Sequence, residues 1–203
     1  QIQAPDGRAI GISELLRGAE LEYVEAESQR LAPGLPPDAL SRAGQGRVAL
    51  VGPEYPDFVA FSYIAHFAEV RVNPLVPRAC VSRMVSVVDC GRVVSRRTAT
   101  SQVYGGQVWG VGAALLEETE VDPRFGGFLN NNIAEYQVPV SGDVRNFEVD
   151  FIDEPDPQFN SLGAKGVGEV AAVGAAAAIA NAVFHATGKR VRDLPIRIEK
   201  LLA

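Results

Sequence analysis

Polar and apolar positions alternate most clearly in two stretches near the middle of the chain. In residues 58–72 two sets of side chains alternate. One set is Phe61, Tyr63, Ala65 and Phe67, and the other is Ser62, Ile64 and His66. Further on, the alternating sets are Val81, Arg83, Val85 and Val87 against Ser82, Met84, Ser86 and Val88. Successive side chains of a strand point to opposite faces of a sheet, so this period of two predicts two strands. Asn73 and Pro74 turn the chain between them, and the prediction is a long antiparallel hairpin.

Shorter strands are predicted on both sides of this hairpin. Residues 47–51, 133–138 and 146–152 have the composition of strands, and the last of them carries apolar side chains at every second position, Phe147, Val149 and Phe151. Residues 122–127 are predicted to form a turn. Near the end of the chain a closing edge strand is predicted from alternation of Leu194, Ile196 and Ile198 with Pro195, Arg197 and Glu199.

Two helices are predicted before and after the hairpin. Ser13 can cap a helix over residues 14–29, which has apolar side chains toward one face. Residues 31–46 hold three prolines and three glycines, and a surface loop, linker or trimmed insertion is expected there. The second helix covers residues 98–118. Its glycines would each weaken an isolated helix by about 1 kcal/mol, so they predict close approach of another backbone or a ligand; they are Gly105, Gly106, Gly110 and Gly112.

A third helix is predicted over residues 170–187, which are rich in alanine. This segment carries no charged residue, so we expect it to be packed on all sides, with Gly188 as its C-cap. It is the one stretch long enough to suggest a membrane span, and Gly174, Asn181 and His185 favour a core helix instead. The predicted fold class is α+β, with mixed or antiparallel strands packed against a long glycine-containing helix and a buried alanine-rich helix.

Composition limits the class of protein. The chain has 203 residues, of which 47% are hydrophobic, and it can therefore bury a substantial core. The net charge of −6 and the lack of basic runs argue against nucleic acid or an anionic membrane as a partner. Cys80 and Cys90 are too few for a disulfide scaffold and lack metal-ligand spacing, so buried reduced thiols are expected. No charged-then-apolar signal segment opens the sequence.

The strongest candidate for chemistry is Glu169, where a glycine-rich loop meets the alanine-rich helix. Gly163, Lys165, Gly166 and Gly168 precede it, and glycines let the backbone take positive φ and come close to a bulky group. An acid in the first turn of a helix is ordinary, because the helix dipole favours it. The alternative is a general base at the edge of a cofactor pocket, and spacing does not decide between the two interpretations.

Other candidates are weaker. The glycines of residues 105–112 resemble a nucleotide fingerprint only superficially, because no acidic residue ends a following strand about twenty residues later. His66 is interpreted as a hydrogen-bonded structural residue, and Trp109 as a core residue. The carboxylates of Asp153, Glu154 and Asp156 cluster near Pro155 and Pro157, and a solvated turn is favoured there over a hard-cation site.

Several longer motifs lie along the sequence. The C-terminal part contains GAKGVGE at residues 163–169 and AAIANAVFHATGKRVRDLPI at residues 177–196. Upstream, in this order, are FSYIAHFAEVRVN, VVDCGRVV, SQVYGGQVWGVGAALLEE and NNNIAEYQVP. Together, and in the order of the family, these motifs resemble the molybdenum-binding subunit of the xanthine dehydrogenase and aldehyde oxidase family of molybdenum hydroxylases. They span about residues 60–200 and look most like the bacterial aldehyde-oxidising branch. The resemblance implies that residues 1–203 are the C-terminal part of a molybdopterin-binding domain.

The resemblance also implies a reaction. Family members oxidise aldehydes or N-heterocycles with water as the oxygen source, and a glutamate that matches Glu169 takes the proton from the Mo–OH group while a hydride passes to the sulfido ligand. No protein side chain ligates the metal. The implied cofactor-binding residues are Gln102, which matches a glutamine that hydrogen-bonds the pterin, and the loop residues Lys165, Gly166, Val167 and Gly168. The Lys165 side chain is expected to pair with a carboxylate.

Further implications concern partners. The family uses a molybdenum-pterin cofactor, here expected in the cytosine dinucleotide form, with iron–sulfur clusters and FAD on partner subunits. The rest of the molybdenum subunit is a required partner, because the family's large subunits are several times longer and carry other glycine-rich cofactor loops. The expected compartment is the cytoplasm, or the periplasm if a signal lies upstream.

Two features leave the activity of this chain open. Family members usually carry Asn-Pro after the DCGRVV run, whereas this chain has Ser95 and Arg96, which changes the local turn. The alternative function is a non-catalytic assembly or binding fragment that keeps the fold and is inactive alone.

Overall fold

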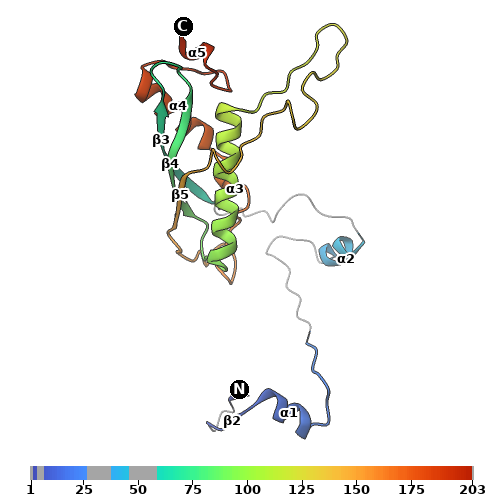
Figure 1. Cartoon of the computed structure of the whole chain (residues 1–203). Coiled ribbons are helices and arrows are strands. Elements are labelled where there is room, and N and C mark those ends of the chain that lie inside the picture. The colour runs from blue at the N-terminus through green and yellow to red at the C-terminus, as the bar shows by residue number, and fades with distance from the viewer. Residues whose placement is uncertain (1, 4–6, 27–37, 46–58, 203) are drawn as a thin grey trace. The chain divides into compact units, whose positions relative to one another are not determined.

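The computed structural model describes residues 2–3, 7–26, 38–45 and 59–202. Contacts group the chain into two units, Gln1–Asp57 and Phe58–Ala203. The second unit carries the long helices and the three-stranded sheet (Figure 1).

The first unit has short elements in its described part. Strands β1 (Ile2–Gln3) and β2 (Ala9–Ile10) pair antiparallel, and helices α1 (Ile12–Gly18) and α2 (Ala39–Gly44) follow. The predicted helix over residues 14–29 is wrong in its bounds, because Gly11 is the N-cap, Ser13 lies inside the helix, and the helix ends at Gly18. None of the residues of α1 is buried, so no packing extends it.

Two other predictions in this unit have different outcomes. Helix α2 lies inside the segment that was expected to be a loop, residues 31–46. The predicted strand at residues 47–51 lies outside the described residues, as do residues 27–29 of the predicted helix.

The second unit is built on a sheet with the strand order β3-β4-β5. Strand β3 (Tyr63–Val72) pairs antiparallel with β4 (Ala79–Asp89), with a register shift after Glu69. This confirms the predicted hairpin. Strand β5 (Asn146–Phe151) runs parallel to β4, from Arg83 opposite Asn146 to Val88 opposite Phe151. A parallel pair needs a crossover connection, and helix α3 (Arg96–Leu115) lies in this one.

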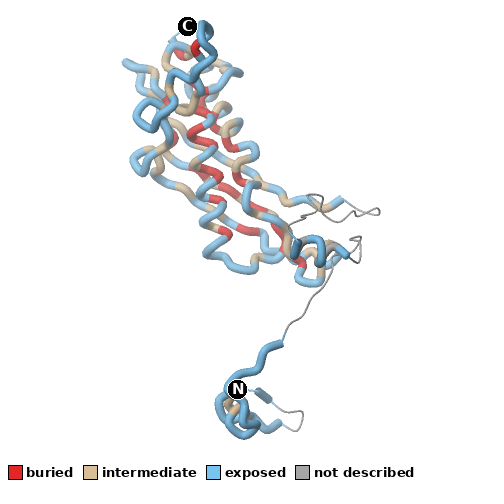
Figure 2. Tube along the Cα trace, turned by 90° about the vertical axis from the view of Figure 1, so that its right-hand side faces the viewer, coloured by how far each residue is buried: buried red, intermediate tan, exposed pale blue. Residues whose placement is uncertain are grey.

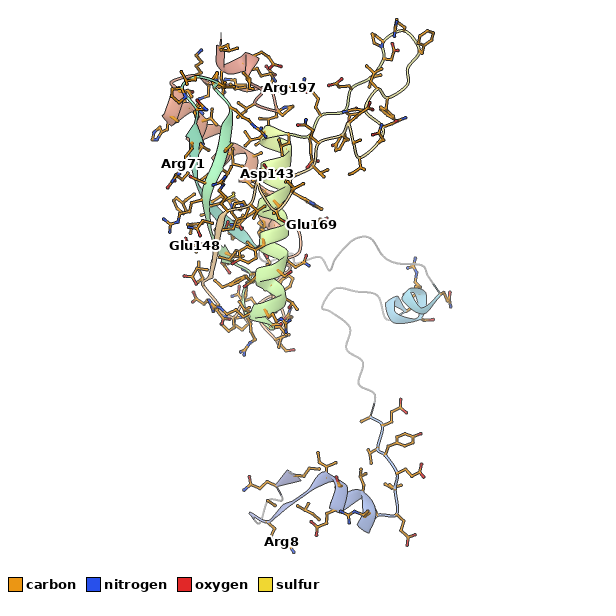
Figure 3. All side chains as sticks on the ribbon, viewed as in Figure 1. Arg8, Arg71, Asp143, Glu148, Glu169 and Arg197 are labelled. Carbon is orange, nitrogen blue, oxygen red and sulfur yellow. The ribbon has the colours of Figure 1, made fainter. Side chains whose placement is uncertain are left out.

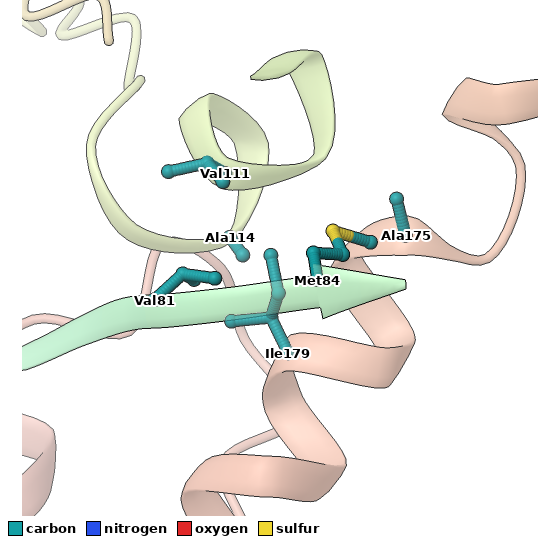
Figure 4. Packing of buried hydrophobic residues seen from close by; sticks show 6 residues of the cluster. All are labelled: Val81, Met84, Val111, Ala114, Ala175 and Ile179. Atoms are coloured by element: carbon teal, nitrogen blue, oxygen red, sulfur yellow. The ribbon is translucent and has the colours of Figure 1, made fainter. Parts of the chain in front are cut away.

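Helices α3 and α4 (Ala175–Thr187) pack on the same face of the sheet. The buried residues form a band between this face and the helices (Figure 2). Met84 of β4 is fully buried between Val111 of α3 and Ile179 of α4 (Figure 4). Side chains on the opposite face of β3 remain open, since Tyr63 and Phe67 are 61% and 64% exposed. The α+β class is therefore observed, with both long helices on one side.

The glycines of α3 lie where the following chain approaches most closely. A Cβ atom on Gly106 would lie 2.5 Å from Cβ of Ala171, and one on Gly110 would overlap Ala175. Gly105, in contrast, has nothing within 4 Å of its Cβ position. The close approach of another backbone is thus confirmed, and it is the chain of residues 171–175 that approaches.

The alanine-rich segment differs from its prediction. A 3₁₀ turn, η1 (Val170–Ala172), comes first, Gly174 then adopts a φ of 81°, and α4 begins at Ala175. Only Ala175, Ile179 and Val183 of α4 are buried, so the expectation of a helix buried on all sides is wrong. These positions repeat every four residues and form one stripe, because α3 and the sheet cover a single side. The C-cap is confirmed: Gly188 has a φ of 73° and its N–H donates to the Phe184 carbonyl at 2.7 Å.

Among the described residues, one stretch, Val170–Thr187, has the length and the apolar composition of a membrane-spanning helix. The break at Gly174 leaves a continuous α-helix of 13 residues. At 1.5 Å per residue it spans about 20 Å, less than the hydrocarbon thickness of about 30 Å.

Two predicted strands are absent from the described second unit. Residues 133–138 form turns and extended chain, and Ile133 is 80% exposed, whereas the predicted turn at residues 122–127 is confirmed by the hydrogen bond from the Asp122 N–H to the Gly127 carbonyl. The closing strand is wrong as well, because the N–H of Ile196 donates to the carbonyl of Ala114 in α3, and helix α5 (Glu199–Leu202) follows. Pro195 has no N–H for a ladder.

Two single-residue expectations also need correction. Cys90 is buried, but Cys80 is exposed; both thiols are free. Burial raises the pKa of the Cys90 thiol. Trp109 is 61% exposed and is not part of the core, so its interpretation as a core residue is wrong.

The contact between α3 and α4 yields a stability prediction. We expect Gly110→Ala to destabilise the protein by about 1–3 kcal/mol, because its methyl group overlaps Ala175. The matched control is Gly105→Ala, which adds a methyl group in open space and should stabilise α3 by about 0.5–1 kcal/mol. Thermal or urea unfolding of the two variants checks this, and equal stabilities would contradict the close packing.

Candidate functional site

The glycine-rich loop is docked on the end of β4 by its first half. Asn160 closes the loop on itself: its Oδ1 accepts from the Gly163 N–H at 2.7 Å, and its Nδ2 donates to the Ala164 carbonyl at 2.8 Å. The Gly163 carbonyl accepts from the N–H of Arg92 at 2.8 Å, and the N–H of Lys165 donates to the Cys90 carbonyl at 2.8 Å. Gly163 has a φ of 72° and no room for a Cβ, so its role is structural.

Lys165 belongs to this docked half. Its side chain is only 9% exposed, and its Nζ lies 3.4 Å from Oδ1 of Asp89 and 3.9 Å from Oδ2 of Asp156. This is the pairing with carboxylates that was expected for the side chain. A buried ammonium held between two carboxylates fixes the loop and is already neutralised.

The second half of the loop is open. Gly166 and Gly168 are exposed and do not take positive φ, so the expectation of positive φ applies to Gly163 alone. A Cβ on Gly166 would meet nothing within 4 Å, and one on Gly168 would meet only Oε1 of Gln102, at 3.8 Å. Within the described part of the chain, the N–H groups of residues 166–169 donate to no backbone carbonyl. Ser62 Oγ donates to the carbonyl of Gly166 and anchors this half from below.

Gln102 lies beside this open half. It is exposed in the second turn of α3, one turn before Gly106, and Gly106 packs against Ala171 of η1. The same packing therefore brings the Gln102 amide next to Gly168. The predicted residues Gln102, Gly166, Val167 and Gly168 come together, whereas the Lys165 side chain points back into the protein.

Glu169 is the N-cap residue of η1 and lies beside α3 (Figure 3). Its carbonyl accepts from the Ala172 N–H at 3.0 Å, and its exposed side chain makes no capping hydrogen bond. The first turn of α4 contains no acidic residue, because η1 and Gly174 separate Glu169 from that helix. Stabilisation of Glu169 by the dipole of the alanine-rich helix is therefore ruled out.

Ser95 and Arg96, which stand where family members usually carry Asn-Pro, make regular local contacts. Ser95 is the N-cap of α3, and its Oγ accepts from the Thr98 N–H. Arg96 pairs with Asp150 at 3.2 Å and lies over the ring of Phe151, with 5.6 Å from its guanidinium carbon to the ring centroid. The helix that carries Gln102 is thus capped and tied to β5.

A row of polar side chains, missed as a group in the sequence, lies under η1. Gln107 and Ser86 are fully buried, with 2.6 Å between Gln107 Nε2 and Ser86 Oγ. His66 Nδ1 lies 2.7 Å from the same hydroxyl. Burial lowers the pKa of His66, and the backbone of Val173 and Ala171 opposes this shift. In the sequence, this row could have been found from two polar residues, Ser86 and Gln107, at positions of a strand and a helix that face the core.

The remaining candidates show no such arrangement. The described residues contain no group of three or more side chains that could hold a metal ion. Residues 153–156 form irregular chain just before a turn at residues 157–159, so the predicted turn lies further on; Asp153 accepts from the Val93 N–H at 2.8 Å, and Asp156 from the N–H of Gln158 at 3.2 Å. A groove of about 650 Å³ is lined by residues that include the charged Arg78, Glu118 and Arg197, and none of the predicted site residues lines it.

Known proteins resemble this chain over about two thirds of its length. Residues 41–145, more than half of the chain, match the family described as the molybdopterin cofactor-binding domain. The aldehyde oxidoreductase molybdenum-binding subunit PaoC of Escherichia coli (strain K12) is 48% identical over 141 residues, covering 70% of this chain and 19% of that protein. The xanthine dehydrogenase molybdenum-binding subunit of Escherichia coli O157:H7 is 33% identical and covers 66% of this chain and 18% of that protein.

Solved structures agree with these relatives. The crystal structure of the aldehyde oxidoreductase from Desulfovibrio desulfuricans ATCC 27774 aligns with a TM-score of 0.63 at 31% identity, over 70% of this chain and 15% of that one. The chain thus spans about a fifth of the length of the curated relatives that it matches. On the family match, supported by these relatives, the chain belongs to the molybdopterin cofactor-binding domain family.

Proposed function

We propose that this chain forms one side of the active site of a molybdenum hydroxylase, with Glu169 as the general base. The observation that carries the proposal is the grouping of Gln102, the open backbone of residues 166–168 and Glu169 at one edge of the second unit. These residues come from α3, from the loop and from the start of η1, and the packing of Gly106 on Ala171 holds the three together. The relatives include proteins named aldehyde oxidoreductases and a xanthine dehydrogenase subunit.

The open half of the loop suits a molybdenum-pterin cofactor. Backbone N–H groups that find no backbone acceptor among the described residues, next to glycines, let a large group with many acceptor atoms come close. Gln102 adds an amide, which can donate and accept at a heterocyclic edge. Lys165 would take part through its backbone position in the loop, because its side chain is held by Asp89 and Asp156. We infer the cytosine dinucleotide form from the likeness to the bacterial aldehyde oxidoreductase.

When bound, that cofactor supplies the oxygen atom given to the substrate and accepts the hydride from it. The role of this chain in the reaction is to move a proton. The Glu169 carboxylate, which forms no ion pair and no capping hydrogen bond among the described residues, accepts the proton from the attacking oxygen. Its main chain is fixed while its side chain is free to reach that oxygen, as a general base requires.

The reaction needs more polypeptide than this chain. The open face of the sheet leaves three aromatic side chains at least 59% exposed, Phe61, Tyr63 and Phe67, and large exposed apolar patches mark interaction surfaces. This supports packing against the rest of a molybdenum subunit, with iron–sulfur and flavin subunits as electron acceptors. Aldehydes are favoured as substrates over N-heterocycles, since a relative at 48% identity is named an aldehyde oxidoreductase.

The test of the base is Glu169→Gln in the complete enzyme. We expect turnover of an aldehyde to fall by about 10²–10⁴-fold, because the amide cannot accept the proton. Molybdenum content should stay normal. The control is Glu154→Gln, which removes another exposed carboxylate, from the segment at residues 153–156. If turnover of Glu169→Gln stays within about tenfold of normal, the result would instead favour a non-catalytic assembly or binding fragment.

A second variant tests the cofactor contact. Gln102→Ala removes one amide at the edge of the loop, and we expect cofactor to be retained about two- to tenfold less tightly, the value of one hydrogen bond. Molybdenum per protein after prolonged dialysis measures this. Gln137→Ala, at an exposed glutamine outside the site, is the control. Equal molybdenum content in both variants would remove Gln102 from the site.

A further inference from the structure

A row of three polar side chains crosses the apolar core below the turn that carries Glu169. His66 and Ser86 are directly opposite each other on β3 and β4, and Gln107 reaches Ser86 from α3. Gln107 and Ser86 have no exposed surface, and their neighbours in the core are apolar, such as Met84, Val88 and Val103. Buried polar groups are costly unless they are paired, so their proton positions are tightly constrained.

The first constraint is the orientation of the Gln107 amide. Its Nε2 lies 2.6 Å from Ser86 Oγ and 3.3 Å from the Glu148 carbonyl oxygen. The atom facing a carbonyl oxygen must be a donor, since two carbonyl oxygens would repel each other there. The NH₂ group thus donates to both, and the Ser86 hydroxyl is an acceptor from Gln107.

The second constraint follows for His66. Because Ser86 Oγ accepts from Gln107, its own O–H is free to donate, and the nearest acceptor is His66 Nδ1 at 2.7 Å. A neutral imidazole that accepts at Nδ1 carries its proton on Nε2. The row therefore specifies one tautomer of His66.

The Nε2 side of the ring faces the turn. Its neighbour Cδ2 lies 3.9 Å from the Cβ position of Gly174. Nε2 is buried and has no hydrogen-bond partner among the described residues, although the ring edge that carries it lies against the turn. Burial lowers the pKa of His66, and the backbone of Val173 and Ala171 partly opposes this shift.

We propose that His66 is a positioning residue that supports the η1 turn, and through it Glu169, by a neutral imidazole whose Nε2–H faces the carbonyls of residues 171 and 173. The inference rests on the proposed role of Glu169. The turn needs such support, because η1 has three residues and its bonds are those from the N–H groups of Ala172 and Val173. Gly106 of α3 holds it from one side and His66 from the other.

The charged and titratable groups near the ring are few in the described chain. His66 lines a shallow groove together with His185 and Arg190. Arg190 is occupied, since its guanidinium carbon lies 3.8 Å from the centroid of the Phe184 ring and its Nη1 donates to Asn181 at 2.6 Å. The proposal therefore depends on the row from Gln107 and not on a charge.

The tautomer is directly measurable. The chain has two histidines, His66 and His185, so ring-nitrogen NMR of the ¹⁵N-histidine-labelled chain gives two patterns, and His185→Gln assigns them. At neutral pH we expect His66 to show a protonated Nε2 and an unprotonated Nδ1. Ser86→Ala should remove this preference. A protonated Nδ1 in the unsubstituted chain would overturn the proposal.

The support of the turn is tested by a pair of variants. His66→Gln can place an amide donor where Nε2 lies, whereas His66→Asn reaches only the position of Nδ1. Hydrogen exchange of the Ala172 and Val173 amides should rise by about tenfold in His66→Asn, the effect of one lost buried hydrogen bond, and much less in His66→Gln. His185→Gln is the control. Equal exchange in the two His66 variants would overturn the proposal.

The complete enzyme separates this inference from the role of Glu169. His66→Asn should lower kcat by about tenfold with KM unchanged, and His66→Gln should restore most of it, since only the placement of the base changes. An unchanged kcat in His66→Asn, in an enzyme where Glu169→Gln is inactive, would overturn the positioning role alone. A normal turnover of Glu169→Gln would instead remove the proposed function and leave the NMR and exchange results standing.

Discussion

The contact on which the site depends is the packing of α3 against the chain of residues 171–175. Gly106 and Gly110 present bare backbone to Ala171 and Ala175, so the two segments approach more closely than side chains would allow. Small residues on both sides make this possible, and each costs helix propensity on α3. The approach sets the position of η1 relative to α3, and with it the distance between Gln102 and the loop that ends at Glu169.

Much of the second unit could be predicted because its signals are local. Side chains alternate along β3 and most of β4 and a turn separates the strands, so the hairpin follows from the pattern. The register shift after Glu69, and the burial of Val81 on the same face as Met84, do not follow from it. The glycines of α3 pointed to a close backbone contact, although not to which segment makes it. The parallel pairing of β5 with β4 had no local signal, because it depends on the crossover through α3.

The wrong predictions concern segments whose structure depends on tertiary contacts that the local sequence pattern does not contain. The segment around Ile196 alternates like a strand, but no sheet edge meets it, and its N–H bonds to the end of α3. The apolar composition of residues 170–187 indicated a fully buried helix, whereas a positive φ at Gly174 breaks it and the sheet covers one side of the rest. An apolar face that is open in this chain is consistent with its covering about a fifth of the length of its relatives.

The candidate site shows why glycines alone could not be assigned roles from the sequence. Gly163, Gly166 and Gly168 look alike in the motif. Position 163 requires glycine, because its φ is positive and a Cβ would clash with Pro155, whereas neither reason applies at positions 166 and 168. The loop is therefore divided at Lys165. Before it, hydrogen bonds close the loop on itself and join it to the residues that follow β4; after it, backbone donors and one carboxylate are left without partners in the described chain. Because the first half of the loop is anchored, the second half can stay rigid while its hydrogen-bonding groups remain unpaired. This combination distinguishes a binding edge from an ordinary turn.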